Sequence, residues 1–108
     1  MGQKFMDKPY FEVMTPLGII VRTTSEYWAR IVTFKHPVMR GKEDLVKAAL
    51  RNPVEIRRSR QDFTVHLYYT PDGPYHICVV AKHLNDEGFI ITAYRTDTIK
   101  EGDHIWPL

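Results

Sequence analysis

The stretch from Phe63 to Ala81, which reads FTVHLYYTPDGPYHICVVA, decides the fold of this chain. On each side of Asp72-Gly73-Pro74, apolar side chains recur at every second position. A period of two is typical of strands, whose successive side chains point to opposite faces. The central Asp-Gly-Pro is typical of a tight turn. The stretch therefore predicts two antiparallel strands joined by a hairpin.

The same period of two continues beyond this hairpin in both directions. Val54 and Ile56 precede it, and another alternating run follows the turn residues Asn85-Asp86-Glu87-Gly88. We therefore expect a four-stranded antiparallel meander from about Val54 to Thr96. The residues expected to face the core are Val54, Ile56, Phe63, Val65, Leu67, Tyr69, Tyr75, Ile77, Val79, Ala81, Phe89, Ile91 and Ala93.

Two helices are predicted upstream of this sheet. Thr23 and Glu26 have the spacing of a capping box, and the apolar residues that follow predict a helix from about Ser25 to Phe34. Pro37 ends this helix, because proline disfavours helical backbone at the residue before it. A second helix with one apolar stripe is expected from Glu43 to Asn52, before Pro53.

Ahead of the helices, the runs Tyr10–Val13 and Ile19–Arg22 surround Thr15-Pro16-Leu17-Gly18, which predicts a hairpin or a pair of short extended segments. The predicted fold class is therefore α+β: an N-terminal hairpin or extended segment, then two helices packed on one face of a four-stranded antiparallel meander sheet. At 108 residues the chain is expected to form a single domain, 1–108.

Composition indicates the cellular setting. The single cysteine, Cys78, excludes an internal disulfide framework and fits a reducing compartment. No apolar run approaches the roughly 18 residues of a membrane helix, and the first residues, Met1–Asp7, lack a secretory apolar region. We therefore expect a cytoplasmic protein without membrane association. Its oligomeric state is left open by the sequence.

The distribution of charge is more informative than the formal net charge of +2. From Arg30 to Arg60 there are nine basic and three acidic residues, so the rest of the chain is slightly acidic. A basic segment on an otherwise acidic protein is typical of a surface that binds a polyanion. The alternative is a solvated helix face rich in lysine and arginine.

The step Lys35-His36-Pro37 lies at the end of the first predicted helix, within this basic segment. Histidine can take up and release a proton near neutral pH, and a neighbouring lysine favours an anionic substrate. Acid/base chemistry on a phosphodiester is therefore one hypothesis for His36. The other is that His36 only caps the end of the helix, where the negative end of the helix dipole lies.

The face of the predicted sheet that points away from the core is polar, basic and aromatic. Such a mixture suits phosphates and stacked bases of single-stranded RNA. The alternative is a half-buried face covered by the N-terminal hairpin. The residues assigned to this face are Arg57, Ser59, Thr64, His66, Tyr68, His76, Cys78, Val80, Lys82, Ile90, Thr92, Tyr94 and Thr96.

Two other features have simpler interpretations. Cys78, His76 and His66 could be imagined as zinc ligands, but one cysteine and two histidines without a closely spaced pair make a weak motif. Trp28 and Trp106 are expected to anchor packing rather than to bind a ligand. No metal or other cofactor is expected.

The Lys-His step after the first helix, the Asn-Pro that ends the second, an Ile-Arg strand and the final Thr92-Ala93-Tyr94 form a combined pattern. Together they resemble the small metal-independent ribonuclease superfamily that includes barnase, colicin D and phage-borne toxin domains, and the colicin D-like pattern in particular. The resemblance covers about residues 23–96. It leaves out the N-terminal hairpin and the Gly102–Trp106 tail.

This resemblance implies a toxin-like endonuclease that cleaves RNA by attack of the ribose 2′-hydroxyl, leaving a 2′,3′-cyclic phosphate. It implies that His36, beside Lys35, is the general acid or base and that it works with Thr92 and Tyr94 on a late strand. Thr92 would hold a phosphate oxygen or orient His36, and Tyr94 would stack on a base. Cations that would stabilise the transition state are Lys35, Arg57 and Lys82, and further binding residues are Ser59, His66, which is also a second candidate acid, Arg58, Arg60 and Arg40.

The expected partner is RNA, with transfer RNA as one candidate, together with an acidic inhibitor or antitoxin protein that would cover the basic face. The alternative function is a non-catalytic RNA-binding or protein-interaction module that uses the same basic face. Mutation would separate the two, because RNA affinity of such a module would not depend on His36.

Overall fold

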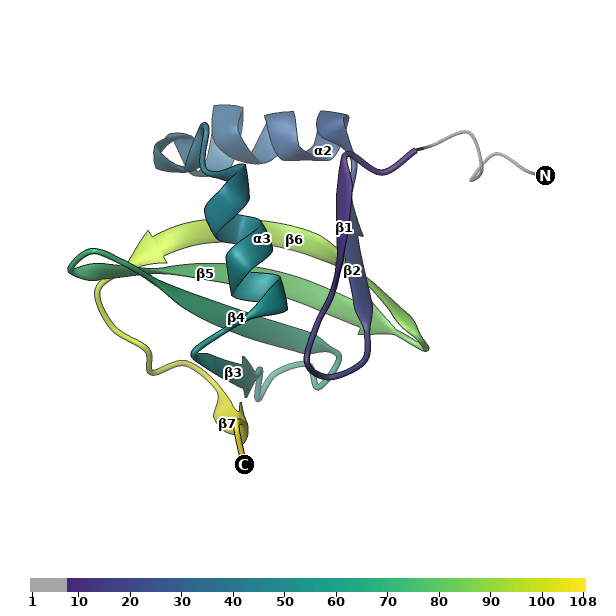
Figure 1. Cartoon of the computed structure of the whole chain (residues 1–108), viewed down its shortest axis with the longest axis vertical. Coiled ribbons are helices and arrows are strands. Elements are labelled where there is room, and N and C mark those ends of the chain that lie inside the picture. The colour runs from purple at the N-terminus through teal and green to yellow at the C-terminus, as the bar shows by residue number, and fades with distance from the viewer. Residues whose placement is uncertain (1–7) are drawn as a thin grey trace.

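Residues 8–108, which the computed structural model describes, contain seven strands in one mixed sheet with helices packed against it (Figure 1). The strand order is β1-β2-β6-β5-β4-β3-β7. The strands are β1 (Phe11–Met14), β2 (Ile20–Thr23), β3 (Glu55–Arg58), β4 (Val65–Asp72), β5 (Tyr75–Leu84), β6 (Glu87–Thr96) and β7 (Asp103–Trp106). The helices are α2 (Ser25–Arg30), the π-helix η1 (Ile31–Lys35), the 3-10 helix η2 (Pro37–Met39) and α3 (Glu43–Arg51).

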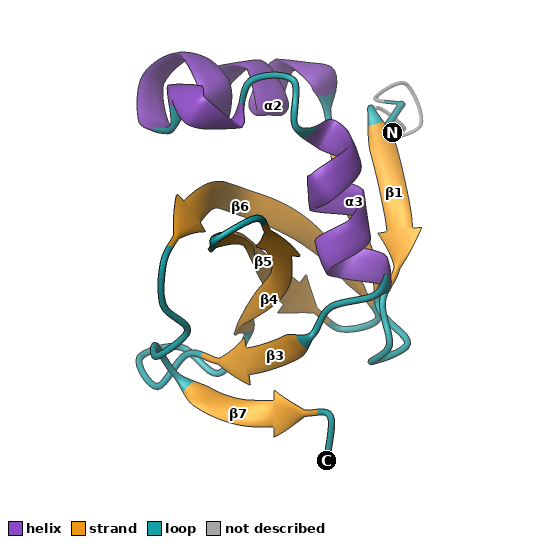
Figure 2. Cartoon of the chain, turned by 60° about the vertical axis from the view of Figure 1, so that its left-hand side comes forward, coloured by secondary structure: helices purple, strands orange, loops and turns teal. Residues whose placement is uncertain are grey.

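The predicted fold class was wrong, because the sheet is not a four-stranded antiparallel meander. Strands β3 to β6 do pair in sequence order and antiparallel, but they form only the centre of the sheet. The N-terminal hairpin β1–β2 joins the sheet through a parallel pairing of β2 with β6, and β7 adds an antiparallel edge strand beside β3 (Figure 2).

The parallel pairing is short and leaves part of β6 open. Only Ile20–Arg22 pair with Glu87–Phe89, so within the described chain β6 has no strand partner on this edge beyond Phe89. Helices η1 and η2 contact β6 there, and the hydroxyl of Tyr27 donates a hydrogen bond of 2.7 Å to the carbonyl of Ile91. The open edge of β6 is thus bordered by the segment that contains His36.

The helices follow the sequence expectations with small shifts. The N-cap of α2 is Thr24 rather than Thr23, and its hydroxyl accepts a hydrogen bond from the backbone N–H of Tyr27. Regular α-helix ends at Arg30, and the π-helix η1 continues to Lys35. Val46, Ala49 and Leu50 of the expected apolar stripe of α3 are buried, and the helix ends at Arg51 with Asn52 as its C-cap.

Both faces of β4 are buried, which explains an error in the predicted core. Leu67, Tyr68, Tyr69 and Thr70 are all less than 9% exposed. Tyr68 packs in the main core below the helices, whereas Leu67 and Tyr69 lie on the opposite face, the reverse of the prediction. His66 also faces the helix side, since His66 pairs with the buried Ala81. Alternation cannot assign faces where every position is buried.

A β-bulge reverses the expected faces of two further residues. The register between β5 and β6 shifts at Val80 and Ala81, so that Val80 pairs with Thr92 and Ala81 pairs with Ile90. Ile90 therefore lies in the core, where Ile91 was expected. Thr92 lies on the face opposite the helices, as predicted.

That opposite face, which we call the open face, carries a small apolar cluster of Leu67, Tyr69 and Cys78. Residues 97–102, which we call the strap, run from β6 to β7, and Ile99 of the strap packs against this cluster (Figure 1). The open face is thus partly covered by the strap and not by the N-terminal hairpin. Trp28 lies in the main core and Trp106 packs against it, in agreement with their expected packing roles.

Candidate functional site

His36 is placed beside the open edge of β6 by the π-helix that precedes it. Its backbone N–H bonds the carbonyl of Ile31, five residues earlier, at 2.8 Å. Ile31 and Val32 are buried and the next three residues are exposed, so the wider turn returns the chain to the sheet at His36. The backbone of His36, not its imidazole, caps the helix.

The imidazole of His36 is half-buried and contacts Tyr94. The two ring centroids are 5.7 Å apart and the rings are inclined by 44°. Tyr94 and Thr92 are two positions apart on β6, so both side chains belong to the open face. The structure therefore places His36 against Tyr94, with Thr92 two residues away from Tyr94 on the same face of β6.

The open face around Tyr94 is largely desolvated. Tyr94 pairs across the sheet with Cys78, which in turn pairs with Tyr69. Burial, the main cause, raises the pKa of the Cys78 thiol to about 12 and also raises the pKa of Tyr94. The hydroxyl oxygen of Thr92 is buried and has no hydrogen-bond partner in the described chain. Because this oxygen has almost no accessible surface, it can bind an incoming group only after the Thr92 side chain rotates toward the surface.

A pocket of about 180 Å³ lies on the open face and shares Tyr94 as a wall. It is smaller than the roughly 300–1,000 Å³ typical of drug-sized ligands, so it suits a group the size of one base. Its sheet-side floor is apolar and its rim is polar. The lining residues are Ser59, Gln61, Val65, Leu67, Val80, Tyr94, Glu101 and Gly102.

The cations expected to stabilise a transition state do not converge on His36. Lys35 is exposed, and its ammonium lies 5.9 Å from the centre of the Tyr27 ring. Lys82 forms an ion pair of 3.2 Å with Asp62. Hydrogen bonds from Thr64, followed by the bond from Lys82, lower the pKa of Asp62 to about 2.

Arg57 is held by the strap and by Glu55. Its guanidinium donates to the backbone carbonyls of Glu101 and Gly102 at 2.8 and 2.9 Å, and to the Glu55 carboxylate at 2.6 Å. Arg57 pairs with Leu67 on the open face, in one cross-strand row with Val80 and Thr92. It is therefore three strands away from Thr92 and fixes the strap rather than approaching His36.

The remaining predicted binding residues are dispersed. Ser59 lines the pocket and bonds Gln61. Arg58 and His66 lie on the helix side of the sheet, and the Arg58 guanidinium covers the Phe63 ring at 4.7 Å. Arg60 pairs with Asp103, and Arg40 donates to the carbonyl of Val32. The structure thus keeps Ser59 with Tyr94 and separates the other four from the pocket.

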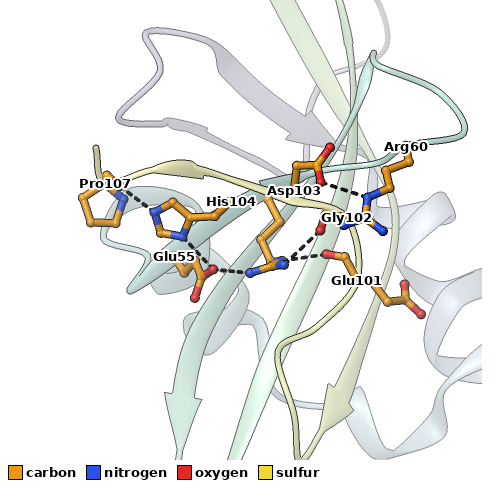
Figure 3. Close-up of polar contacts among 8 residues, drawn as sticks. Glu55, Arg60, Glu101, Gly102, Asp103, His104 and Pro107 are labelled. Atoms are coloured by element: carbon orange, nitrogen blue, oxygen red, sulfur yellow. Dashed lines mark hydrogen bonds and ion pairs between the residues drawn. The ribbon is translucent and has the colours of Figure 1, made fainter.

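A network that the sequence did not indicate joins β3 to β7 (Figure 3). His104 lies 2.8 Å from the Glu55 carboxylate through Nδ1 and 2.6 Å from the Pro107 carbonyl through Nε2. Both partners are hydrogen-bond acceptors, so the geometry requires a proton on each nitrogen. The bond to Pro107, followed by the bond to Glu55, raises the pKa of His104. No local motif links Glu55 to His104, since they are brought together only by the β3–β7 pairing.

A second unpredicted feature is a stacked histidine pair on the helix side. The rings of His66 and His83 are 3.8 Å apart and almost parallel, and the Tyr68 hydroxyl lies 2.9 Å from Nε2 of His83. Burial, followed by the charge of His66, lowers the pKa of His83 to about 4. His66 is on the opposite face from Cys78, so these two cannot share a zinc ion. Residues 8–108 contain no cluster of three side chains suited to holding a metal.

The same residues include no helix that is long and apolar enough to cross a membrane. No protein-family model, curated protein or solved structure matches this chain.

Proposed function

We propose that this chain is a metal-independent endoribonuclease that uses His36 for proton transfer and binds RNA along the open face. The observation that carries this proposal is the contact between His36 and Tyr94, because Tyr94 also lines the pocket. One aromatic ring thus connects an acid/base group with a base-sized cavity. Thr92, with its buried and unpartnered hydroxyl, lies two residues away on the same strand.

Cleavage by the ribose 2′-hydroxyl requires two proton transfers. One group removes the 2′ proton, and another protonates the leaving oxygen, while the phosphate becomes cyclic. His36 removes the 2′ proton, a contribution of about 10²–10⁴ in rate for a positioned group, and a water molecule protonates the leaving 5′ oxygen. The Thr92 hydroxyl donates to a phosphate oxygen, and the Tyr94 ring borders the base in the pocket. These roles need no metal ion.

The cations contribute unequally. The pair between Lys82 and Asp62 is partly exposed, and water and salt weaken such pairs, so phosphate can replace Asp62. Lys35 is exposed beside His36 and is free to approach a phosphate. Arg57 makes three hydrogen bonds and is assigned to holding the strap, which forms one wall of the pocket.

The non-catalytic alternative draws support from the same ion pairs. Arg57 and Lys82, two of the cations expected to stabilise a transition state, are instead paired with the carboxylates of Glu55 and Asp62, which leaves His36 with less cationic support for catalysis. In either case an acidic inhibitor protein is a fitting partner for the exposed cations.

The decisive experiment is incubation of the purified chain with total RNA in excess chelator, beside His36→Ala and the control His76→Ala. His76 is a second open-face histidine, opposite Thr96 at the far end of β6. The proposal expects fragments ending in 2′,3′-cyclic phosphate from the wild type and from His76→Ala, and none from His36→Ala.

Intact RNA in every lane would exclude the enzyme. Retained affinity for RNA in that case would establish the binding module. Thermal melting of each variant shows whether loss of cleavage reflects loss of folding.

A further inference from the structure

Phe34 is the most exposed aromatic side chain among the described residues, at 80% exposure. It lies in the π-helix η1, two residues before His36, and nearby Val38 is also 41% exposed. A large apolar ring on an ordered turn gains nothing from facing water. Single exposed apolar residues are common on protein surfaces, so the exposure of Phe34 gains meaning only from the charges around it.

The geometry of η1 fixes the direction of Phe34. Because the π turn returns to the sheet at His36, the residues Thr33, Phe34 and Lys35 form the outward part of the turn. Phe34 thus faces away from β6, and Lys35 lies between Phe34 and His36 along the chain. In this structure the Lys35 ammonium lies over the Tyr27 ring, and its exposed side chain is long enough to turn toward a ligand bound near Phe34.

The segment around Phe34 is basic. Between Arg30 and Lys42 the chain has four cations, His36 and no acidic residue, and of these cations Lys42 pairs with Asp72 from the β4 strand. Arg30 precedes Phe34 by four residues, and the guanidinium of Arg40 bonds the carbonyl of Val32 within η1. Arg40 is thereby held beside the π turn. The surface formed by Arg30, Phe34, Lys35, Val38 and Arg40, which we call the basic turn, combines an aromatic ring with positive charge.

A second exposed phenylalanine provides the contrast. Phe63 is 65% exposed, yet the Arg58 guanidinium covers its ring at 4.7 Å. That cation–π contact gives Phe63 an intramolecular partner. No aromatic or cation–π contact of this kind involves Phe34 in the described part of the chain.

We propose that the basic turn is a stacking platform for single-stranded RNA, on which Phe34 stacks against a base next to the cleavage site while Lys35 and Arg40 contact its phosphates. This inference rests on the proposed function and adds a second binding position, outside the pocket. Base–aromatic stacking tolerates every base, because each has a π-face. The platform therefore supplies affinity for unpaired RNA rather than sequence preference.

The test measures binding separately from cleavage. A fluorescent single-stranded oligonucleotide with 2′-O-methyl ribose at each position has no free 2′-hydroxyl, so it cannot be cleaved by that route. Fluorescence anisotropy should show Phe34→Ala binding this probe about 5- to 150-fold more weakly than wild type, the range expected for the loss of one stacked base. Phe34→Trp should keep wild-type affinity, and the matched control Phe63→Ala should stay within about twofold.

Equal affinity of wild type and Phe34→Ala would overturn the inference, as would a wild type that fails to bind the probe. The cleavage assay separates the two proposals. If the protein cleaves RNA but binds the probe equally well with and without Phe34, the platform proposal is wrong and the ribonuclease proposal stands. If binding depends on Phe34 but no RNA is cleaved, the platform proposal stands and the ribonuclease proposal is wrong. Phe34 is on the surface, so Phe34→Ala is expected to fold normally.

Discussion

His36 and Tyr94 hold their rings 5.7 Å apart, although one residue follows a helix near the start of the chain and the other lies on the last long strand. The contact exists because β2 leaves the edge of β6 after Phe89, which makes room for the π-helix and its exit. Two structural irregularities, a short parallel pairing and a π turn, thus position the candidate acid/base group.

The ring of Tyr94 should matter more than its hydroxyl. Tyr94→Phe keeps the contact with His36 and the pocket wall, so cleavage should remain within about threefold of wild type. Tyr94→Ala removes both, and a displaced catalytic group can cost about 100-fold in rate. Measurement of kcat/KM for both variants tests this, with thermal melting as a check on folding. Wild-type kcat/KM in Tyr94→Ala would contradict the role given to this residue.

Acid should destabilise the protein through His83. Its folded pKa of about 4 lies below the 6.5 of an exposed histidine, so its stabilising effect is complete above about pH 6.5 and is lost as pH falls toward 4. His83→Gln should therefore reduce the loss of unfolding free energy between pH 7.5 and 4.5 by about 1–3 kcal/mol. Urea titrations at both values measure it. If His83→Gln loses as much unfolding free energy between pH 7.5 and 4.5 as the wild type does, groups other than His83 cause the loss.

High pH should weaken the attachment of the edge strand β7 to β3, because His104 of β7 loses its proton. Because hydrogen bonds to Pro107 and Glu55 raise its folded pKa, the stabilisation is complete below about pH 6.5 and is lost as pH rises through the folded value. Hydrogen-exchange protection of Ile105 and Trp106, corrected for intrinsic rates, should fall with pH in the wild type. In His104→Ala it should be low throughout. Equal protection in both proteins at pH 6 would show that His104 does not hold β7.

Replacement of Gly102, the glycine of the strap, should cost more stability than replacement of Gly41. Its φ is +77°, and an added Cβ would lie 2.5 Å from the carbonyl oxygen of Arg58. Gly41 has a similar φ of +81° with open space around it. Both alanine variants share a conformational cost of about 1–2 kcal/mol. Gly102→Ala should lose a further ~1–3 kcal/mol from the clash, measured by urea unfolding. Equal losses would mean that the strap shifts freely.

The local elements were accessible from the sequence, but the pairing of distant segments was not. Turn residues and periodicity located the meander strands and α3, because those signals are local. Nothing in β2 distinguishes a parallel partner, and β7 is only four residues long. The two faces of β4 could not be told apart from the sequence, because both are buried: Tyr68 lies in the main core and Leu67 in the small cluster on the open face.

The candidate site shows the same division. His36 was selected by residue type and position and Tyr94 by the resemblance to the ribonuclease superfamily, and the structure places the two in contact. Arg57 and Lys82 were expected to stabilise a transition state, whereas each has an acidic partner in the fold. Asp62, the partner of Lys82, lies in the loop before β4, whose position no periodicity predicts, whereas Glu55 and Arg57 lie two residues apart on β3. His104 and His83 were missed because their partners are far away in sequence.

The join between β2 and β6 also sets an order of events during synthesis. Strand β2 is made early, yet its partner residues Glu87–Phe89 emerge from the ribosome only after most of the chain. Until then β2 can pair only with β1, and a two-stranded hairpin is marginally stable by itself. Contacts between such distant segments form slowly, because the intervening chain must first be ordered. The N-terminal hairpin can therefore join the sheet only after β6 has been synthesised.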